Sequence, residues 1–128
     1  MTKQAKAGAP EKPVESFLPL TPAVFHILLT LADGEAHGYA VMREVTRRSG
    51  GSVRLGPGTL YGAISRLLED GIVAESEERP DPDKDDTRRR YYRLTQLGGR
   101  VLTAETERLA DLVKAARSTK VVRKLRPA

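Results

Sequence analysis

The chain has 128 residues, with 22 lysines and arginines against 17 aspartates and glutamates, a formal net charge of +5 and no cysteine. The missing cysteines exclude disulfides, thiolate metal ligands and a cysteine nucleophile, and no apolar run is long enough to cross a bilayer. The basic balance permits nucleic acid as a partner. We expect one small domain with tails, located in the cytoplasm and independent of membranes.

The first predicted element is a helix that begins at Thr21-Pro22. Residues 1–16 before it mix Lys, Ala, Pro and Glu without periodicity and predict a disordered tail. Threonine can cap free backbone N–H groups, and proline at the first helical position gives up no needed hydrogen bond. Apolar residues between Val24 and Leu31 cover most of the helix circumference, and Asp33-Gly34 ends it. Because so small a chain has little to bury such a helix, a second subunit is a natural source of cover.

A second helix is expected to open at His37-Gly38 and to stop at Gly50-Gly51. The residues at apolar helical spacing are Tyr39, Val41, Met42 and Val45. The wetter side of this helix carries Arg43, Arg47 and Arg48.

A third helix is predicted to begin around residues 57–59 and to end at Gly71. Its apolar stripe, at positions i, i+4, i+7 and i+8, consists of Leu60, Ile64, Leu67 and Leu68. The opposite side combines short polar side chains with long hydrogen-bond donors, which a helix entering a DNA major groove needs. The residues of this polar side are Thr59, Tyr61, Gly62, Ser65 and Arg66.

Two strands are predicted around a turn-rich loop. Residues 72–74 lead into the first strand, and residues 80–86 combine prolines with acids, which excludes regular structure there. In the second strand Arg90, Tyr92 and Leu94 are expected on one face, alternating with residues 89, 91 and 93. Two strands around such a loop predict a β-hairpin.

The last predicted helix starts at Thr95, which can cap it, and has no proline before Pro127. A helix of more than about twenty residues is over about 30 Å long and outreaches a domain of this size. Its apolar stripe consists of Val101, Leu102, Leu109, Leu112, Val113 and Ala116. The part of the stripe beyond the domain requires a partner.

These elements predict a mainly α-helical fold with a small β-hairpin (α+β), arranged as a winged helix-turn-helix with a long C-terminal dimerisation helix. We assign residues 1–16 to a disordered N-terminal tail and residues 17–94 to the DNA-binding domain. The dimerisation helix is expected over residues 95–118, and a basic C-terminal tail over residues 119–128.

Five short blocks follow one another along the chain: LTP at 20–22, HGY at 37–39, GPGTLYG at 56–62, LLEDGI at 67–72 and RRYYRLT at 89–95. Each block alone is weak, but their order and spacing together are specific. In these blocks the chain resembles the short-form members of the PadR family of transcriptional regulators. The resemblance extends from about residue 18 to residue 114.

The resemblance implies a sequence-specific DNA-binding transcriptional regulator, a repressor acting as a homodimer on a pseudo-palindromic promoter site. It implies that the third helix enters the major groove, that the wing contacts the backbone or minor groove, and that the first and last helices build the dimer. It also implies, for some members, a small aromatic effector held between the subunits. Support for such an effector is thin here, because the chain has no tryptophan and its only phenylalanines are Phe17 and Phe25.

The predicted DNA-binding residues come from the third helix and from the wing, whose acidic tip leaves few cations. They are Thr59, Tyr61, Gly62, Ser65, Arg66, Lys84, Arg88 and Arg90. Three alternatives stay open: Tyr61 as a half-buried core residue, Thr59 as a helix cap, and Arg66 paired with an acid of its own helix, Glu69 or Asp70. The predicted dimerisation residues are Phe25, Leu28, Leu29, Leu102, Leu109, Leu112 and Val113.

No arrangement of residues indicates catalysis, a cofactor or a metal site. The two histidines, His26 and His37, stand apart, and zinc-protease and Walker motifs are absent from the sequence. We therefore expect a protein that is not an enzyme. The alternative function is a winged-helix protein-interaction module that docks a partner through the acidic loop at 81–86. RNA binding through the basic tail lacks the exposed aromatics that stack on unpaired bases.

Overall fold

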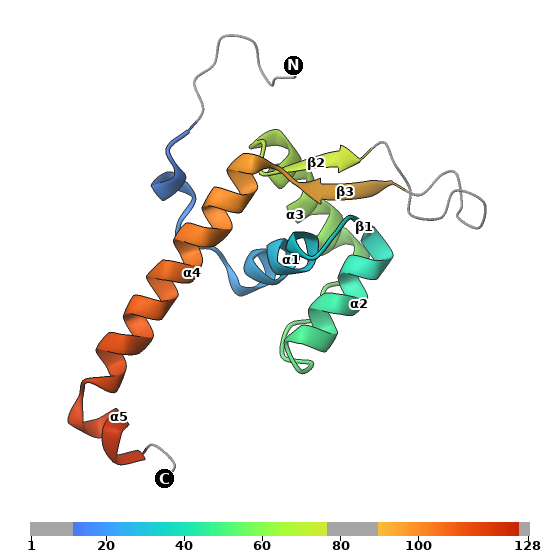
Figure 1. Ribbon diagram of the computed structural model, residues 1–128. Helices are drawn as coiled ribbons and strands as arrows, with labels where there is room; N and C mark the ends of the chain where they lie inside the picture. Colours follow the sequence, from blue (N-terminus) through green and yellow to red (C-terminus); the bar gives the residue numbers. More distant parts are fainter. Residues whose placement is uncertain (1–11, 77–89, 126–128) are drawn as a thin grey trace.

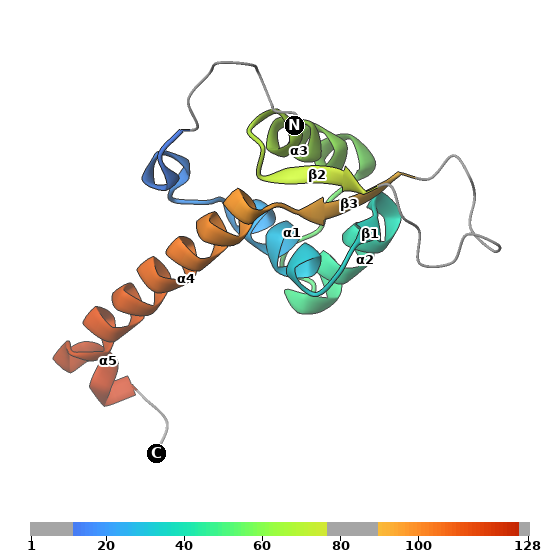
Figure 2. The same ribbon diagram turned by 45° about the horizontal axis from the view of Figure 1, so that its top comes forward.

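The computed structural model describes residues 12–76 and 90–125, which form a small helical body with one long projecting helix (Figure 1). In chain order the elements are η1 (Val14–Phe17), α1 (Pro22–Ala32), β1 (Ala36–His37), α2 (Gly38–Arg48), α3 (Pro57–Glu69), β2 (Val73–Ser76), β3 (Tyr91–Leu94), α4 (Gln96–Arg117) and α5 (Lys120–Leu125). Figure 2 shows α4 leading away from α1, α2, α3 and the sheet. The mainly helical winged helix-turn-helix that the sequence predicts is confirmed.

The helix starts follow the residue types that the sequence places there. Thr21 is the N-cap of α1, and its Oγ1 accepts a hydrogen bond from the Val24 N–H at 3.1 Å. Thr95 caps α4 in the same way, accepting from the Gly98 N–H at 3.0 Å. Each cap satisfies a backbone donor that the first helical turn leaves without a partner.

The core lies where α1, α2, α3 and the beginning of α4 meet the sheet. Each of these helices contributes apolar side chains to it, and burying one such side chain stabilises the fold by about 1.5–3 kcal/mol. The fully buried apolar side chains are Ile27, Leu28, Val41, Val45, Leu60, Ile64, Ile72, Val73 and Val101. This core holds α3 so that only its other side faces solvent.

The sheet has three strands rather than the two expected, in the order β1-β3-β2. β1 contains only Ala36 and His37, which pair antiparallel with Tyr92 and Tyr91 of β3. The strand predicted from the alternation of residues 89–94 is β3, in which Tyr91 and Tyr92 point to opposite faces of the sheet. Both Tyr91 and Tyr92 are buried, and the His37 ring packs edge-on against Tyr91 at a centroid distance of 5.3 Å.

Both predicted tails contain regular structure in their described parts. The tail assigned to residues 1–16 is too long, because Val14 begins η1, whose apolar residues pack against the core. At the other end the predicted helix boundary is close, since α4 ends at Arg117, but a second helix, α5, follows within the expected tail. Among the described helices, none is long and apolar enough to span a bilayer.

A buried carboxylate ties the segment before α1 to α4. Glu105 is only 1% exposed. Its Oε2 accepts a hydrogen bond from the Leu20 N–H at 2.9 Å, and Arg108 donates to both carboxylate oxygens at 2.6 and 2.9 Å. No role is predicted for Glu105 from the sequence, although its spacing, four residues after Val101 and four before Leu109, places it on the apolar side of this helix.

This contact predicts a stability that depends on pH. Hydrogen bonds from Arg108 hold the pKa of the Glu105 carboxyl below its ordinary value of 4.5, outweighing burial, which raises it. Because the folded-state pKa is lowered, the stabilisation is complete above about pH 4.5 and is lost as the pH falls through the folded-state pKa. Glu105→Gln should therefore melt several degrees below the wild type at neutral pH, with a difference that shrinks on acidification.

Thermal unfolding followed by circular dichroism over this pH range measures the effect. Glu107→Gln is the matched control, since Glu107 is exposed and forms no ion pair within the described chain. A pH-independent gap between wild type and Glu105→Gln would contradict the role of the charge.

Candidate nucleic-acid interface

α3 turns one apolar side to the core and one polar side to solvent. Gly56 is its N-cap residue and Pro57 opens the first turn. Its buried residues are Leu60, Ala63, Ile64 and Leu67. Thr59, Tyr61, Ser65 and Arg66 are exposed and Gly62 is half-buried; these five residues are called the α3 strip. The polar surface that the sequence predicts is thus accessible along the whole helix.

Two of the alternative roles do not hold in the structure. Thr59 is not the helix cap, because the N-cap position belongs to Gly56 and Thr59 lies inside the first turn. Arg66 pairs with neither Glu69 nor Asp70, and it forms no other ion pair within residues 12–76 and 90–125. Its Nη1 lies 3.9 Å from where a Cβ on Gly62 would stand. A cation on the strip is therefore not neutralised by its own helix.

Tyr61 links the α3 strip to the beginning of α2. A Cβ on Gly38 would lie 2.9 Å from Tyr61 Cε1 and closer still to Cζ and Oη, so only glycine leaves room for this ring. The side chain nevertheless stays 45% exposed. Packing and surface roles for Tyr61 are therefore compatible. Burial raises the pKa of Tyr92 above its ordinary value of 10.0, and the nearby Tyr61 and Glu75 contribute in the same direction.

The described part of the wing supplies one of its three predicted cations. Arg90 is exposed and its Nη1 lies 2.9 Å from Glu75 Oε2. An exposed pair of this kind is worth about 0–1 kcal/mol, so a phosphate can replace the carboxylate at little cost. Lys84, Arg88 and the acidic loop at 81–86 lie outside the described residues.

Comparison with known protein families matches residues 27–104 to the transcriptional regulator PadR-like family. That span is more than half of the chain and includes α2, α3, the sheet and the first part of α4. The chain belongs to the PadR-like family. It is a DNA-binding regulator of transcription, as the five sequence blocks indicate.

Two relatives and one solved structure show what the chain is similar to. A transcriptional regulator of Mycobacterium tuberculosis is 38% identical over 89 residues, which span 70% of this chain and 77% of the relative. An uncharacterised 37.1 kDa protein of a Streptomyces fradiae transposon is 40% identical over 86 residues, which span 67% of this chain but only 22% of that protein. A PadR family transcription regulator from Clostridium difficile has the same fold, with a TM-score of 0.62 and 21% identity over 74% of this chain and 94% of that one.

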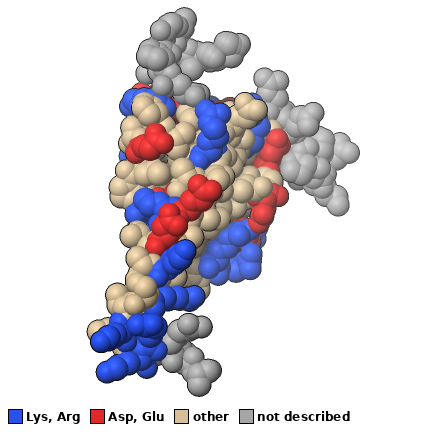
Figure 3. All heavy atoms as spheres, turned by 60° about the vertical axis from the view of Figure 1, so that its left-hand side comes forward, with Lys and Arg blue, Asp and Glu red and all other residues tan. Residues whose placement is uncertain are grey.

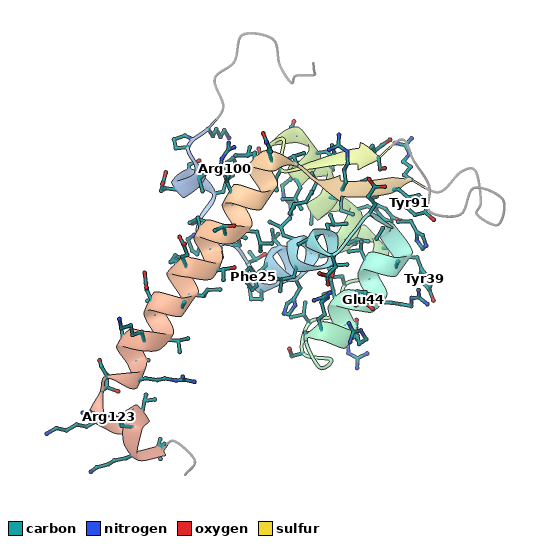
Figure 4. All side chains as sticks on the ribbon, viewed as in Figure 1. Phe25, Tyr39, Glu44, Tyr91, Arg100 and Arg123 are labelled. Carbon is teal, nitrogen blue, oxygen red and sulfur yellow. The ribbon has the colours of Figure 1, made fainter. Side chains whose placement is uncertain are left out.

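In this PadR-like regulator the distal half of α4 carries apolar side chains that the described chain does not cover. Leu112 is 54% exposed and Val113 49% exposed. Half-buried members of the predicted dimerisation set are Phe25, Leu29, Leu102 and Leu109. Figure 4 shows Phe25 on the side of α1 nearest α4, and Figure 3 shows basic side chains gathered around the far end of α4 and α5.

Leu28 is a correction to the predicted dimerisation set. It is fully buried in the core of the single chain and so has no surface left for a second copy. A helix that is apolar on most of its circumference predicts extensive burial, but the pattern does not say which residues the chain's own core takes.

Tyr39 is a second correction, because the sequence places it on the apolar side of the second helix and misses its exposure at the surface. Its position predicted an apolar contact on α2, yet the side chain is 57% exposed, whereas Val41 and Val45 are fully buried. The Arg43 guanidinium lies over its ring. The sequence feature that could have indicated an exposed Tyr39 is the arginine one turn after it, since a tyrosine and an arginine at this spacing lie together on a helix surface.

Proposed function

We propose that this PadR-like regulator represses transcription by binding, as a homodimer, a pseudo-palindromic site in a promoter. The observation that carries the proposal is the exposure of the α3 strip on a helix whose opposite side is fixed in the core. The strip combines hydroxyl groups, a glycine and an arginine that pairs with no acid of the described residues, which is the chemistry that reads base edges and holds phosphates.

The distal half of α4 supports the dimer. Leu112 and Val113 are exposed apolar residues on a helix that projects from the body, where a second copy of α4 can cover them (Figure 1). A two-fold pair of chains would present two α3 helices, which meet successive major grooves when they stand about 34–36 Å apart. Repression requires only that the bound dimer occupy the promoter.

The direct test uses a fluorescently labelled duplex from the region upstream of the chain's own gene, with a scrambled duplex of equal length as control. We expect tighter binding to the upstream duplex, footprint protection of two half-sites related by a dyad, and the mass of two chains in sedimentation equilibrium. Equal affinity for both duplexes, or a single protected half-site, would contradict the proposal.

Arg66→Ala should weaken binding to the upstream duplex by about ten- to hundredfold, since a bidentate arginine contact to a base edge is worth about 1–3 kcal/mol. Fluorescence anisotropy titrations measure the change. Arg117→Ala removes the same charge from the far end of α4 and should leave affinity close to wild type. If both variants bind alike, Arg66 has no specific contact with DNA.

A further inference from the structure

A cation–π pair, Arg43 over the Tyr39 ring, lies on α2, beside the α3 strip but separate from it. Tyr39 and Arg43 stand one turn apart on this helix and both are exposed. The Arg43 Cζ atom lies 5.1 Å from the centre of the Tyr39 ring. Figure 4 shows Tyr39 pointing outward from α2, on the side away from α1.

Arg43 differs from the other arginines of α2 in what it contacts. Arg47 is held by Glu44, to which its Nε and Nη2 donate at 2.8–3.1 Å, and Arg48 pairs with Asp33. In the described ranges, 12–76 and 90–125, Arg43 forms no ion pair, and the Tyr39 ring is its partner. A guanidinium stacked on a ring is held in place while its N–H donors stay directed outward, where an anion can accept them.

The position of this pair relative to α3 indicates which anion the Arg43 guanidinium can bind. Gly38, which precedes Tyr39, packs against the Tyr61 ring of the α3 strip, so the beginning of α2 lies beside the strip. In a helix-turn-helix the first of the two helices crosses the DNA backbone while the second lies in the groove. A duplex seated on the α3 strip therefore brings phosphates past the exposed side of α2.

We propose that Arg43, positioned by the Tyr39 ring, binds a backbone phosphate of the duplex that the α3 strip engages. The proposal rests on the proposed function and extends the DNA surface from α3 to α2. Tyr39 acts as a positioning residue through its ring, and the guanidinium makes the contact. Since a phosphate carries no base identity, the contact adds affinity for duplex DNA of any sequence.

The experiment measures anisotropy with the upstream and scrambled duplexes over a range of KCl concentrations. Arg43→Gln should weaken binding to both duplexes by a similar factor of about ten, and should reduce the slope of log affinity against log salt by about 0.9. Tyr39→Ala should reproduce most of this loss, whereas Tyr39→Phe, which keeps the ring, should bind like the wild type. Arg47→Gln is the matched control, because it removes a positive charge from the same helix, and Glu44 already neutralises that charge in the wild type.

The outcomes separate this proposal from the function on which it rests. Unchanged binding by Arg43→Gln, while Arg66→Ala binds weakly, overturns the α2 contact and leaves the role of α3 intact. Equal losses in Arg43→Gln and Arg47→Gln show an effect of net charge alone and also overturn it. Wild-type affinity in Tyr39→Ala overturns the positioning role. A wild-type protein that binds neither duplex removes both proposals. Circular dichroism melting confirms that each variant is folded, as expected for exposed positions.

Discussion

A chain carrying Leu112→Asp together with Val113→Asp should sediment as a monomer and should lose about hundredfold or more of its affinity for the upstream duplex. The two side chains are about half exposed in the single chain, so aspartates there remain solvated and the protomer keeps its fold. In the proposed dimer the same positions face a second copy, where four carboxylates would be brought together and out of water. Losing the second α3 helix removes the gain from joining two binding sites, about 10²–10⁴-fold in affinity.

Ala110→Asp provides the control for this prediction. Ala110 is exposed on the same turn of α4 but lies outside the apolar stripe, so the added charge should stay in water and leave the dimer intact. Sedimentation equilibrium gives the mass of each variant, and anisotropy gives its affinity. A Leu112→Asp/Val113→Asp chain that still has the mass of two subunits would place the dimer interface elsewhere.

The features that could be predicted from the sequence are those fixed by neighbouring residues. Thr21 and Thr95 were predicted as helix caps because the capping contact reaches only three residues along the chain. The apolar and polar sides of α3 were predictable for a similar reason, since helical periodicity alone decides which residues share a side. The five blocks then placed these elements in a known family.

The features that could not be predicted depend on contacts between distant segments. β1 has two residues, too few for a strand pattern, and exists because β3 offers it a free edge. Leu28 and Tyr39 carry the same periodic signal as their neighbours, yet one lies in the core and the other on the surface. The buried Glu105 carboxylate accepts a hydrogen bond from the N–H of Leu20, 85 positions earlier in the chain, a partner that no local pattern predicts.

Gly98→Ala should be among the most destabilising single substitutions in the chain, at about 3 kcal/mol, the upper end of the range for overpacking a core. Gly98 is buried in the first turn of α4, against the loop that precedes β2. A Cβ there would lie 2.8 Å from Leu94 Cδ1 and closer still to the Ile72 carbonyl oxygen. This carbonyl cannot retreat freely, because it accepts hydrogen bonds from both the N–H and the hydroxyl of Thr95.

The neighbouring glycine separates this steric effect from helix propensity. A Cβ on Gly99 would meet nothing within 4 Å. Gly99→Ala should therefore stabilise the chain by about 0.5–1 kcal/mol, the ordinary gain from replacing glycine inside a helix. Urea unfolding followed by circular dichroism gives both values from the midpoints, provided that the slopes are equal. Because the Thr95 hydroxyl also caps α4, displacing the Ile72 carbonyl would disturb the hairpin and the start of the long helix together. A wild-type urea midpoint for Gly98→Ala would contradict this prediction, since it would show that the contacts around Gly98 are looser than their distances imply.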